Sequence, residues 1–331
     1  MLAPKGSVAW PLQPRVDRDL GGEGQAILPP SGPTAKPHSG MSPWQERNLA
    51  AITRRLAPLR HSPQGILFER RSVYNHIVVR RKRNQFLLCY RHQQSRVEEV
   101  QSRLDPLSPL DLLSPYTQAM LLALVWCPQP RRILFIGLGG GRLQMVLHHA
   151  FESAQLDTVE LDPLVVDLAT RFFGFFPDER QRTVIADGRS HIRALTAGTT
   201  YDLIILDAYQ AEGVAPHLLT YDFYSECRAL LGPHGLVVSN LHSSTPVYDA
   251  ARRTFAAAFR YTTACSVPSG NIVVIGSDTV SLDSRVLWNR AALSEWLGTS
   301  GLPLTAWAKN ISFRPPYRRR ASILRDSRLS A

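Results

Sequence analysis

Three acidic side chains in the middle of the chain stand where a parallel sheet would gather them for chemistry. Glu160 and Asp187 follow two short apolar runs, and Asp207 follows a third run at 201–206. Because the carboxyl ends of parallel strands meet at one edge of a sheet, we expect the three carboxylates to line one crevice. There Glu160 can accept the hydroxyls of a ribose, Asp187 can accept the amino group of an adenine, and Asp207 can take a proton from an attacking amine.

A glycine-rich turn precedes these carboxylates and suits close contact with a ligand. The apolar run 133–136 leads into a turn that contains Gly137, Gly139 and Gly141. Glycine lets the backbone take positive φ and approach a ligand, and the amides of the amphipathic helix expected after the turn attract negative charge. The fingerprint of NAD-binding proteins has a further glycine where Arg142 stands, so the turn disfavours NAD. Gly188, directly after Asp187, belongs to the same expected nucleotide site.

The aspartates near these strand ends also have purely structural interpretations. Asp162 precedes Pro163, so a role as the cap of the helix that this proline opens is equally expected. A helix cap is likewise an alternative role for Asp187. A loop or helix cap is one for Asp207, since aspartate is common at strand ends. The sequence leaves both kinds of role open.

Strand-like and helix-like segments alternate around these residues and predict the fold class. Helices are expected from Gly141 and Pro163, and strands at 132–136, 156–160, 183–185, 201–206 and 235–240. This alternation is typical of a parallel sheet covered by helices on both faces. The segments 262–267 and 271–275 are expected to pair across a Pro-Ser-Gly turn. A closing hairpin favours an α/β fold of the class I S-adenosylmethionine (SAM) methyltransferase-like, Rossmann-like type over a dinucleotide-binding fold.

Composition divides the chain into four parts. They are a disordered Pro/Gly-rich leader, a small β-hairpin domain, a SAM-type nucleotide-binding Rossmann-like domain and a basic C-terminal extension, at residues 1–62, 63–112, 113–282 and 283–331. Within the leader, Ser42-Pro43-Trp44 resembles a capped helix start, which suggests that translation begins at Met41. In the small domain, residues 77–79 are expected to face 86–88 across a basic turn, and a helix is expected from Ser114.

The net charge of +11 is concentrated in two clusters, Arg80–Arg83 and the arginines between Arg314 and Arg328. A solvated turn and a disordered end are the simplest interpretations of such runs, and contact with nucleic acid is the less favoured alternative. No apolar stretch reaches the roughly 20 residues that span a bilayer, so membrane insertion is not expected. The cysteines lie far apart, which indicates neither a metal site nor a disulfide framework and fits a cytoplasmic protein.

Together these motifs resemble the spermidine synthase (polyamine aminopropyltransferase) family. The resemblance covers roughly residues 70–280 and is carried by the glycine turn, Val159-Glu160-Leu161-Asp162, Ala186-Asp187-Gly188, Asp207 and Thr220-Tyr-Asp-Phe-Tyr224. It implies that Asp207 activates the amine and that a SAM-type nucleotide is held by Gly137, Gly139, Glu160, Asp187 and Gly188. It also implies a homodimer formed through the small N-terminal domain.

Several positions depart from the pattern of that family and bear on the substrate. Gly140 stands where the family has an aspartate for the aminopropyl amine, and Gln210 stands where it has a second carboxylate for the diamine. Tyr116-Thr117-Gln118 replaces a Tyr-His-Glu stretch, and Tyr74-Asn75 replaces a Tyr-Gln pair; Tyr116 and Gln210 are the candidate substrate residues. Each lost carboxylate removes a contact of up to a few kcal/mol, taking unit charges about 4 Å apart at an effective dielectric of about 20.

The departure at position 140 also affects the choice of nucleotide. An aspartate there would repel the carboxylate of SAM and favour decarboxylated SAM, whereas glycine removes that filter and Arg142 could attract the carboxylate. The glycine turn and the run 159–188 also resemble the spermidine synthase-like methyltransferase domain that modifies the N terminus of elongation factor 1A. The resemblances therefore imply two different group transfers.

The sequence predicts a transferase that uses SAM or decarboxylated SAM. Transfer of an aminopropyl group to an amine, as in polyamine biosynthesis, is nearly balanced with N-methylation of a small amine or of an amine on a protein. A third hypothesis is a catalytically inactive basic module that keeps the fold and binds nucleic acid, suggested by the missing substrate carboxylates and the arginine tail.

Overall fold

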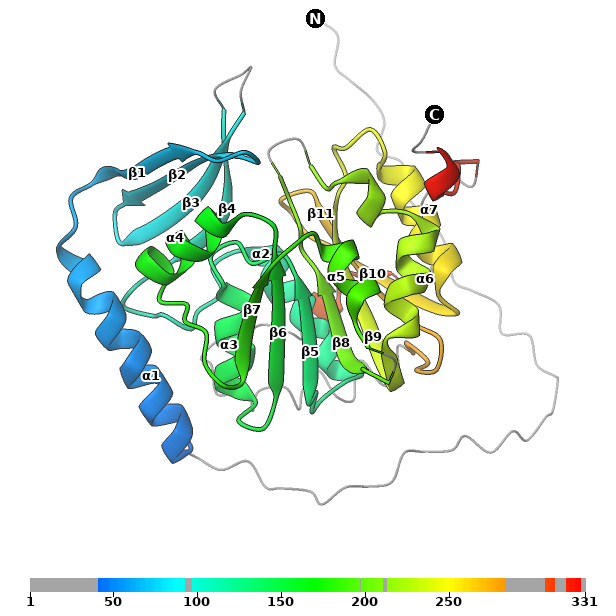
Figure 1. The fold of residues 1–331 in the computed structure, drawn as a ribbon, viewed down its shortest axis with the longest axis horizontal. Coiled ribbons are helices and arrows are strands. Elements are labelled where there is room, and N and C mark those ends of the chain that lie inside the picture. Colours follow the sequence, from blue (N-terminus) through cyan, green and yellow to red (C-terminus); the bar gives the residue numbers. More distant parts are fainter. Residues whose placement is uncertain are drawn as a thin grey trace, which may run out of the picture. The chain divides into compact units, whose positions relative to one another are not determined.

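The centre of the structure is an eight-stranded mixed sheet (Figure 1). This computed structural model describes residues 41–92, 97–196, 198–210, 213–283, 307–312 and 320–328. The strands run in the order β12-β10-β11-β9-β8-β5-β6-β7. Their bounds are β5 Arg132–Ile136, β6 Gln155–Glu160, β7 Gln181–Ile185, β8 Tyr201–Leu206, β9 Leu231–His242, β10 Tyr261–Ser266, β11 Asn271–Ser277 and β12 Ile311–Ser312. The strands from β5 to β9 pair in parallel, whereas β10 and β11 form an antiparallel hairpin, so the predicted α/β fold class is confirmed.

Side chains of the parallel strands alternate between two apolar cores, as the pleat of a strand requires. In β5, Ile133 and Phe135 enter one core, while Leu134 and Ile136 enter the other. Helices α2, α3 and α4 cover the first core, and α5, α6 and α7 cover the second. Their bounds are α2 Pro115–Met120, α3 Arg142–Ala150, α4 Pro163–Phe173, α5 Gly188–Ala194, α6 Tyr221–Ala229 and α7 Tyr248–Ala258.

The helix expected from Ser114 begins as predicted but is short. Ser114 is the N-cap of α2, and Pro115 occupies its first position. After Met120 the chain continues as a 3₁₀ helix, η2 (Leu121–Val125), all of whose residues are buried. The apolar residues expected on one helical face are therefore packed on all sides, in a tighter helix.

The small N-terminal domain is an antiparallel sheet in the order β1-β2-β3-β4. Its strands are β1 Gly65–Arg71, β2 His76–Lys82, β3 Gln85–Arg91 and β4 Glu98–Leu104. The expected hairpin is confirmed, because Val79 pairs with Leu88 in β2 and β3. One face of the sheet joins the core that also contains β5, and the hydroxyl of Ser102 in β4 accepts the amide of Gly140. The small domain thus contacts the glycine turn directly.

The prediction of a disordered leader was wrong for helix α1 (Pro43–Leu56). The helix begins at a capping box, in which the hydroxyl of Ser42 accepts the amide of Gln45 and the side chain of Gln45 accepts the amide of Ser42. Ile52 and Leu56 lie one turn apart and are buried in the first core. The capped helix start expected at Ser42-Pro43-Trp44 is therefore confirmed, whereas the composition of the leader does not reveal that a few apolar residues at helical spacing dock the helix. The rest of the leader, up to residue 40, lies outside the described residues.

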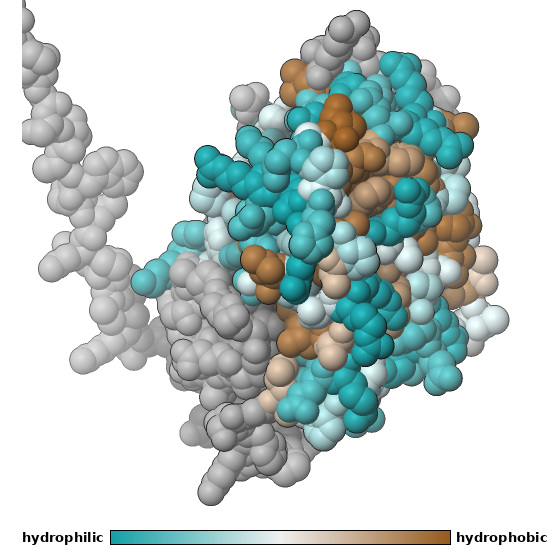
Figure 2. Space-filling view, turned by 90° about the vertical axis from the view of Figure 1, so that its left-hand side faces the viewer, coloured by the Kyte–Doolittle hydropathy of each residue, from teal (hydrophilic) through white to brown (hydrophobic). Residues whose placement is uncertain are grey.

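Cation–π contacts add to the docking of α1. The guanidinium of Arg180 lies 4.3 Å from the ring centroid of Trp44, and that of Arg55 lies 3.5 Å from the ring centroid of Phe176. The outer residues of the helix are charged and exposed, among them Glu46. Figure 2 shows the side of the molecule on which α1 lies, where hydrophilic residues are interspersed with hydrophobic ones.

The C-terminal extension contains two described parts that pack on the core domain. β12 pairs with β10 at the edge of the sheet. Residues 320–328, called the C-terminal segment below, lie against α6 and α7: the amide of Leu324 donates to the hydroxyl of Thr254, and its carbonyl accepts the amide of Tyr221. A disordered end was therefore the wrong interpretation for this segment. Outside the described residues lie Arg314, Arg318 and Arg319.

Part of the first basic cluster serves the fold itself. Arg80 forms an ion pair with Glu98 at 2.7 Å, and Arg81 donates to the carbonyl of Ser62. The cysteines are all buried and unpaired. Among the described residues, no helix is long and apolar enough to cross a membrane, and no cluster of His, Cys, Asp or Glu is arranged to hold a metal ion.

Candidate functional site

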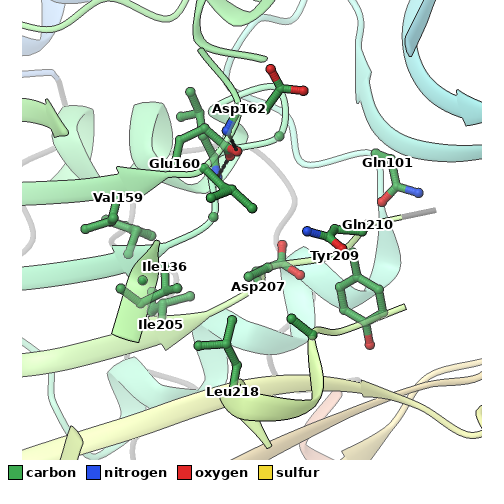
Figure 3. Close-up of a pocket in the computed structure, with 18 of the residues that line it drawn as sticks. Gln101, Ile136, Val159, Glu160, Asp162, Ile205, Asp207, Tyr209, Gln210 and Leu218 are labelled. Carbon is green, nitrogen blue, oxygen red and sulfur yellow. Dashed lines mark hydrogen bonds between the residues drawn. The ribbon is translucent and has the colours of Figure 1, made fainter. Parts of the chain in front are cut away.

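A pocket lies at the carboxyl edge of the parallel strands and collects the three carboxylates (Figure 3). Glu160 ends β6, Asp187 follows β7 and Asp207 follows β8, so the expected convergence on one rim is what the structure shows. The pocket is also lined by Tyr116, Gly137, Gly139, Gly188 and Gln210. Gly141 does not line it, because it is the N-cap residue of α3 and lies against Phe175.

The glycine turn passes close to the end of β8. Gly137 has a φ of 101°, and a Cβ atom at this position would lie 2.3 Å from the carbonyl oxygen of Asp207. Glycine is required here, because both the backbone conformation and the neighbouring chain exclude a side chain. The close approach brings the turn and Asp207 into one wall of the pocket.

Glu160 is buried and fixes the shape of the turn. One carboxylate oxygen accepts the amide of Leu138 at 2.9 Å, and the other accepts the amide of Asp162 at 2.9 Å. Burial raises the pKa of Glu160, although these hydrogen bonds act in the opposite direction. The amide of Leu161 also hydrogen-bonds the carboxylate, and the acceptor capacity that remains is open to hydroxyl donors from the pocket.

Asp162 has the structural role that its position before a proline indicated. Its carboxylate accepts the amide of Leu164 at 2.9 Å, which caps α4, and it also accepts the hydroxyl of Ser72 from the small domain. The cap interpretation is therefore confirmed, and the carboxylate additionally joins the two domains.

Asp187 is a helix cap and a pocket residue at once. Its Oδ1 accepts the amide and the hydroxyl of Ser190, which caps α5, and its Oδ2 lies 2.7 Å from Nε2 of His217. Burial alone would raise the pKa of Asp187, but the hydrogen bonds from Ser190 and His217 hold it below its usual value. The two interpretations of Asp187 are therefore compatible.

Asp207 is not a cap, because its carboxylate faces the pocket. Its Oδ1 accepts the side-chain amide of Asn240 at 3.0 Å, and the Tyr116 hydroxyl also hydrogen-bonds the carboxylate. The carboxylate is enclosed by protein on its other sides. This burial raises the pKa of Asp207 despite the two hydrogen bonds. A raised pKa makes the carboxylate a better proton acceptor.

Beyond Asp207 the pocket is lined by neutral polar groups. Figure 3 shows Asp207 between Glu160 on one side and Gln101, Tyr209 and Gln210 on the other. The Tyr116 hydroxyl shares its one proton between the Asp207 carboxylate and the carbonyl of Gln101, which lies 3.3 Å from the hydroxyl oxygen. The backbone of Gln210 pairs with that of Gly213 at 3.0 Å, which shapes the loop after β8. This end of the pocket can offer hydrogen bonds to a polar molecule without adding charge.

Comparison with known proteins decides the family. The chain is 31% identical to the polyamine aminopropyltransferase of Vibrio vulnificus over 284 residues, which is 84% of this chain and 94% of the relative. The chain belongs to the spermine/spermidine synthase family. The model of the spermine/spermidine synthase domain matches residues 116–264.

Other relatives of the chain are methyltransferases. The human eEF1A lysine and N-terminal methyltransferase is 33% identical over 122 residues, which is 34% of this chain and 18% of that protein. Two solved structures share the fold alone. A spermidine synthase in complex with the transition-state analogue AdoDATO has a TM-score of 0.57 at 19% identity, covering 76% of this chain and 85% of its own. Human methyltransferase-like protein 13 in complex with SAH has a TM-score of 0.51 at 24% identity, covering 56% and 92%.

Position 140 of the chain has no room for a side chain. A Cβ atom on Gly140 would lie 2.9 Å from the ring of Phe173 and 2.9 Å from Cβ of Ser102. The hydroxyl of Ser102 accepts the Gly140 amide at 2.8 Å. Replacement of an aspartate by glycine is therefore built into the packing of the small domain against the turn.

Arg142 lines the pocket and is also tied to the loop before α2. Its guanidinium is buried and donates to the carbonyl oxygens of Pro109 and Asp111. Burial lowers the pKa of Arg142 to about 10. Its side chain thus holds the loop before α2, and attraction of a ligand carboxylate by its charge stays a prediction.

Sequence reasoning missed Ser102 and His217, which line the pocket, and Asn240, which hydrogen-bonds Asp207. Asn240 stands near the end of β9, which is the parallel neighbour of β8. The rule that ligand-binding residues lie at the carboxyl ends of parallel strands, which indicated Asp207, therefore also indicates Asn240. Ser102 and His217 come from a different domain and from a long loop. No local pattern marks them, because their role depends on tertiary packing.

Proposed function

We propose that the protein transfers an aminopropyl group from decarboxylated SAM to an amine. The observation that carries this proposal is Asp207, a carboxylate of raised pKa that faces the pocket at the end of β8. Membership of the spermine/spermidine synthase family supports the same reaction, because the relative matched over 94% of its length is a polyamine aminopropyltransferase.

The proposed chemistry is a displacement at carbon. The nitrogen lone pair of the amine attacks the carbon next to the sulfonium sulfur, the carbon–sulfur bond breaks, and both of its electrons return to sulfur as a neutral thioether. The proton released from nitrogen passes to Asp207. Hydrogen bonds from Asn240 and Tyr116 hold the carboxylate in place while this happens.

The adenosine part of the donor is proposed to lie along the carboxyl ends of β5, β6 and β7. Glu160 would accept the ribose hydroxyls with its remaining lone pairs, and Asp187 would accept the adenine amino group. Gly188 lies against Ile136 in the wall of the pocket and has no room for a side chain, because a Cβ atom there would lie 2.4 Å from the side chain of Ile136. A sulfonium on the far side of Glu160 would then face Asp207.

Methyl transfer from SAM is the second candidate, and the packing at position 140 favours it. No carboxylate can stand there, since Ser102 and Phe173 fill the space around Gly140. The carboxylate of SAM therefore meets no fixed negative charge at this point of the turn. The chain's similarity to the human eEF1A methyltransferase covers only 18% of that protein.

Product analysis separates the two candidates. The full-length protein would be incubated with SAM or with decarboxylated SAM and a panel of mono- and diamines, and the nucleoside products identified by mass spectrometry. Release of 5′-methylthioadenosine is expected and reports aminopropyl transfer. Release of S-adenosylhomocysteine alone would replace the first candidate by the second.

The same assay has a matched control. Asp167 is an exposed aspartate on α4 that pairs with Arg171, so Asp167→Asn should leave product formation unchanged while Asp207→Asn removes it. Failure of the wild-type protein to bind either donor, measured by calorimetry, would contradict both candidates.

A further inference from the structure

The C-terminal segment reaches toward the nucleotide site through a chain of ionic contacts. Asp326, in the short 3₁₀ helix η5 (Asp326–Arg328), contributes both carboxylate oxygens to Arg189, at 2.7 and 2.6 Å. Glu226 on α6 contributes two more contacts to the same guanidinium, each at 2.7 Å. The Arg189 side chain is only 6% exposed. Bidentate pairs of this kind fix both the place and the plane of a guanidinium.

Arg189 passes this constraint to the loop that follows Asp207. It stands in the first turn of α5, two residues after Asp187, and its remaining donor reaches the carbonyl of His217 at 3.3 Å. His217 lies in the 3₁₀ helix η3 (Pro216–Leu218), and Asp326 also hydrogen-bonds the hydroxyl of Thr220. The C-terminal segment therefore holds this end of the loop at two points.

The side chain of His217 completes the connection to the pocket. Its Nε2 lies 2.7 Å from Oδ2 of Asp187, while Ser190 occupies Oδ1. With both oxygens engaged, the plane of the Asp187 carboxylate is set, and the lone pairs that remain point in fixed directions. His217 and its neighbour Leu218 both line the pocket.

We propose that the C-terminal segment is a positioning element of the nucleotide site. Asp326 fixes Arg189, and Arg189 holds the backbone of His217. The His217 ring then orients the Asp187 carboxylate for the adenine amino group. This inference rests on the proposed function only in that an adenine nucleoside occupies the pocket. It applies equally to aminopropyl and methyl transfer, because both donors contain adenosine.

Binding of 5′-methylthioadenosine to the full-length protein tests the inference. Removing a charge-assisted contact of about 1 kcal/mol lowers an equilibrium constant about fivefold, so Asp326→Asn is expected to weaken binding about fivefold in calorimetry. His217→Ala is expected to weaken it at least as much. Because both changes interrupt one chain of contacts, the double variant should bind no more than about twofold worse than His217→Ala alone.

Two variants control for a merely structural effect. Asp326→Glu keeps the charge and is expected to restore most of the affinity. Arg193→Gln removes an exposed arginine that pairs with the same two carboxylates but does not contact His217, and it should leave affinity unchanged. Hydrogen exchange at residues 215–219 should rise in Asp326→Asn and stay at the wild-type level in Arg193→Gln.

The outcomes separate this inference from the proposed function. If the wild-type protein binds the nucleoside and Asp326→Asn binds it equally well, the positioning role is wrong while the function stands. A loss of affinity in Asp326→Asn accompanied by an equal loss in Arg193→Gln would also overturn it, since the effect would then be general loosening of the surface. If the wild-type protein does not bind the nucleoside, the inference is overturned together with the proposed function.

Discussion

The two halves of the pocket differ in how their polar groups are used. In the half formed by β6 and β7, backbone amides hold the carboxylate of Glu160, and the amide of Ser190 together with the side chains of Ser190 and His217 holds that of Asp187. In the other half, Asp207 is the one carboxylate among the lining residues that the structure describes. The side chains of Gln101 and Gln210 around it are neutral. Fixed acceptors suit the recognition of a constant ligand part, whereas a single proton acceptor among neutral groups suits a chemical step.

The largest effect is expected from Asp207→Asn. Loss of a general base lowers turnover by about 10²- to 10⁴-fold, while the affinity for the nucleoside should stay within about threefold because Glu160 and Asp187 are untouched. Because burial raises the pKa of Asp207, the ionised carboxylate costs stability at neutral pH, so the variant should melt no lower than the wild type. Steady-state kinetics, calorimetry and thermal unfolding check these points. Equal turnover in the variant would refute the assignment.

The pH dependence of turnover sharpens the same contrast. Asp207 acts as a base only when ionised, and burial raises its pKa above the ordinary value. The turnover number at saturating amine should therefore fall about tenfold per pH unit once the pH drops below that raised pKa. Asp187 has a lowered pKa and stays ionised over this range, whereas burial raises the pKa of Glu160 as well. The control is therefore Glu160→Gln, which cannot titrate at this position: its nucleoside affinity should stay level while turnover falls. A fall in affinity that parallels the fall in turnover in this variant would contradict the division into halves.

Glu160→Gln probes the other half. The amide that replaces one carboxylate oxygen would face a backbone N–H donor at Leu138 or Asp162, so one hydrogen bond is lost and two donors oppose each other. Nucleoside affinity should fall about tenfold, a loss of roughly 1.4 kcal/mol. Asp157→Asn is the control, because Asp157 lies in the same strand but contacts Tyr201 away from the pocket. Unchanged affinity in Glu160→Gln would show that the two halves are not distinct.

The smallest effect is expected from Gln210→Glu. A second carboxylate near the neutral half would attract a second ammonium group, since a partly screened charge pair contributes about 1 kcal/mol or less. The ratio of kcat/KM for a diamine to that for a monoamine should rise about threefold, with nucleoside affinity unchanged. No change in this ratio would mean that Gln210 does not face the acceptor.

The sequence was sufficient for the parts of the site that depend on local pattern. The strands that carry Glu160 and Asp207 end where apolar runs end, and Gly137 marks a backbone conformation that only glycine takes easily. The caps at Asp162 and Asp187 also follow from neighbours a few residues away. Each of these features is decided within about one turn of chain.

The rest depends on contacts between distant parts of the chain. The capped start of helix α1 at Ser42 was visible in the sequence, but the helix was not recognised as part of the fold because its docking rests on few residues, among them Ile52 and Leu56. The C-terminal segment was hidden by its arginines, although Leu324 and Asp326 decide where it packs. A run of like charges predicts that the charged side chains repel one another. It does not predict which single residues of the segment contact other parts of the chain.

A structure of the protein with bound 5′-methylthioadenosine tests the central claim most directly. The account predicts that the ribose hydroxyls contact Glu160, that the adenine amino group contacts Asp187, and that the sulfur faces the carboxylate of Asp207. A nucleoside bound elsewhere, or one whose sulfur points away from Asp207, would contradict it.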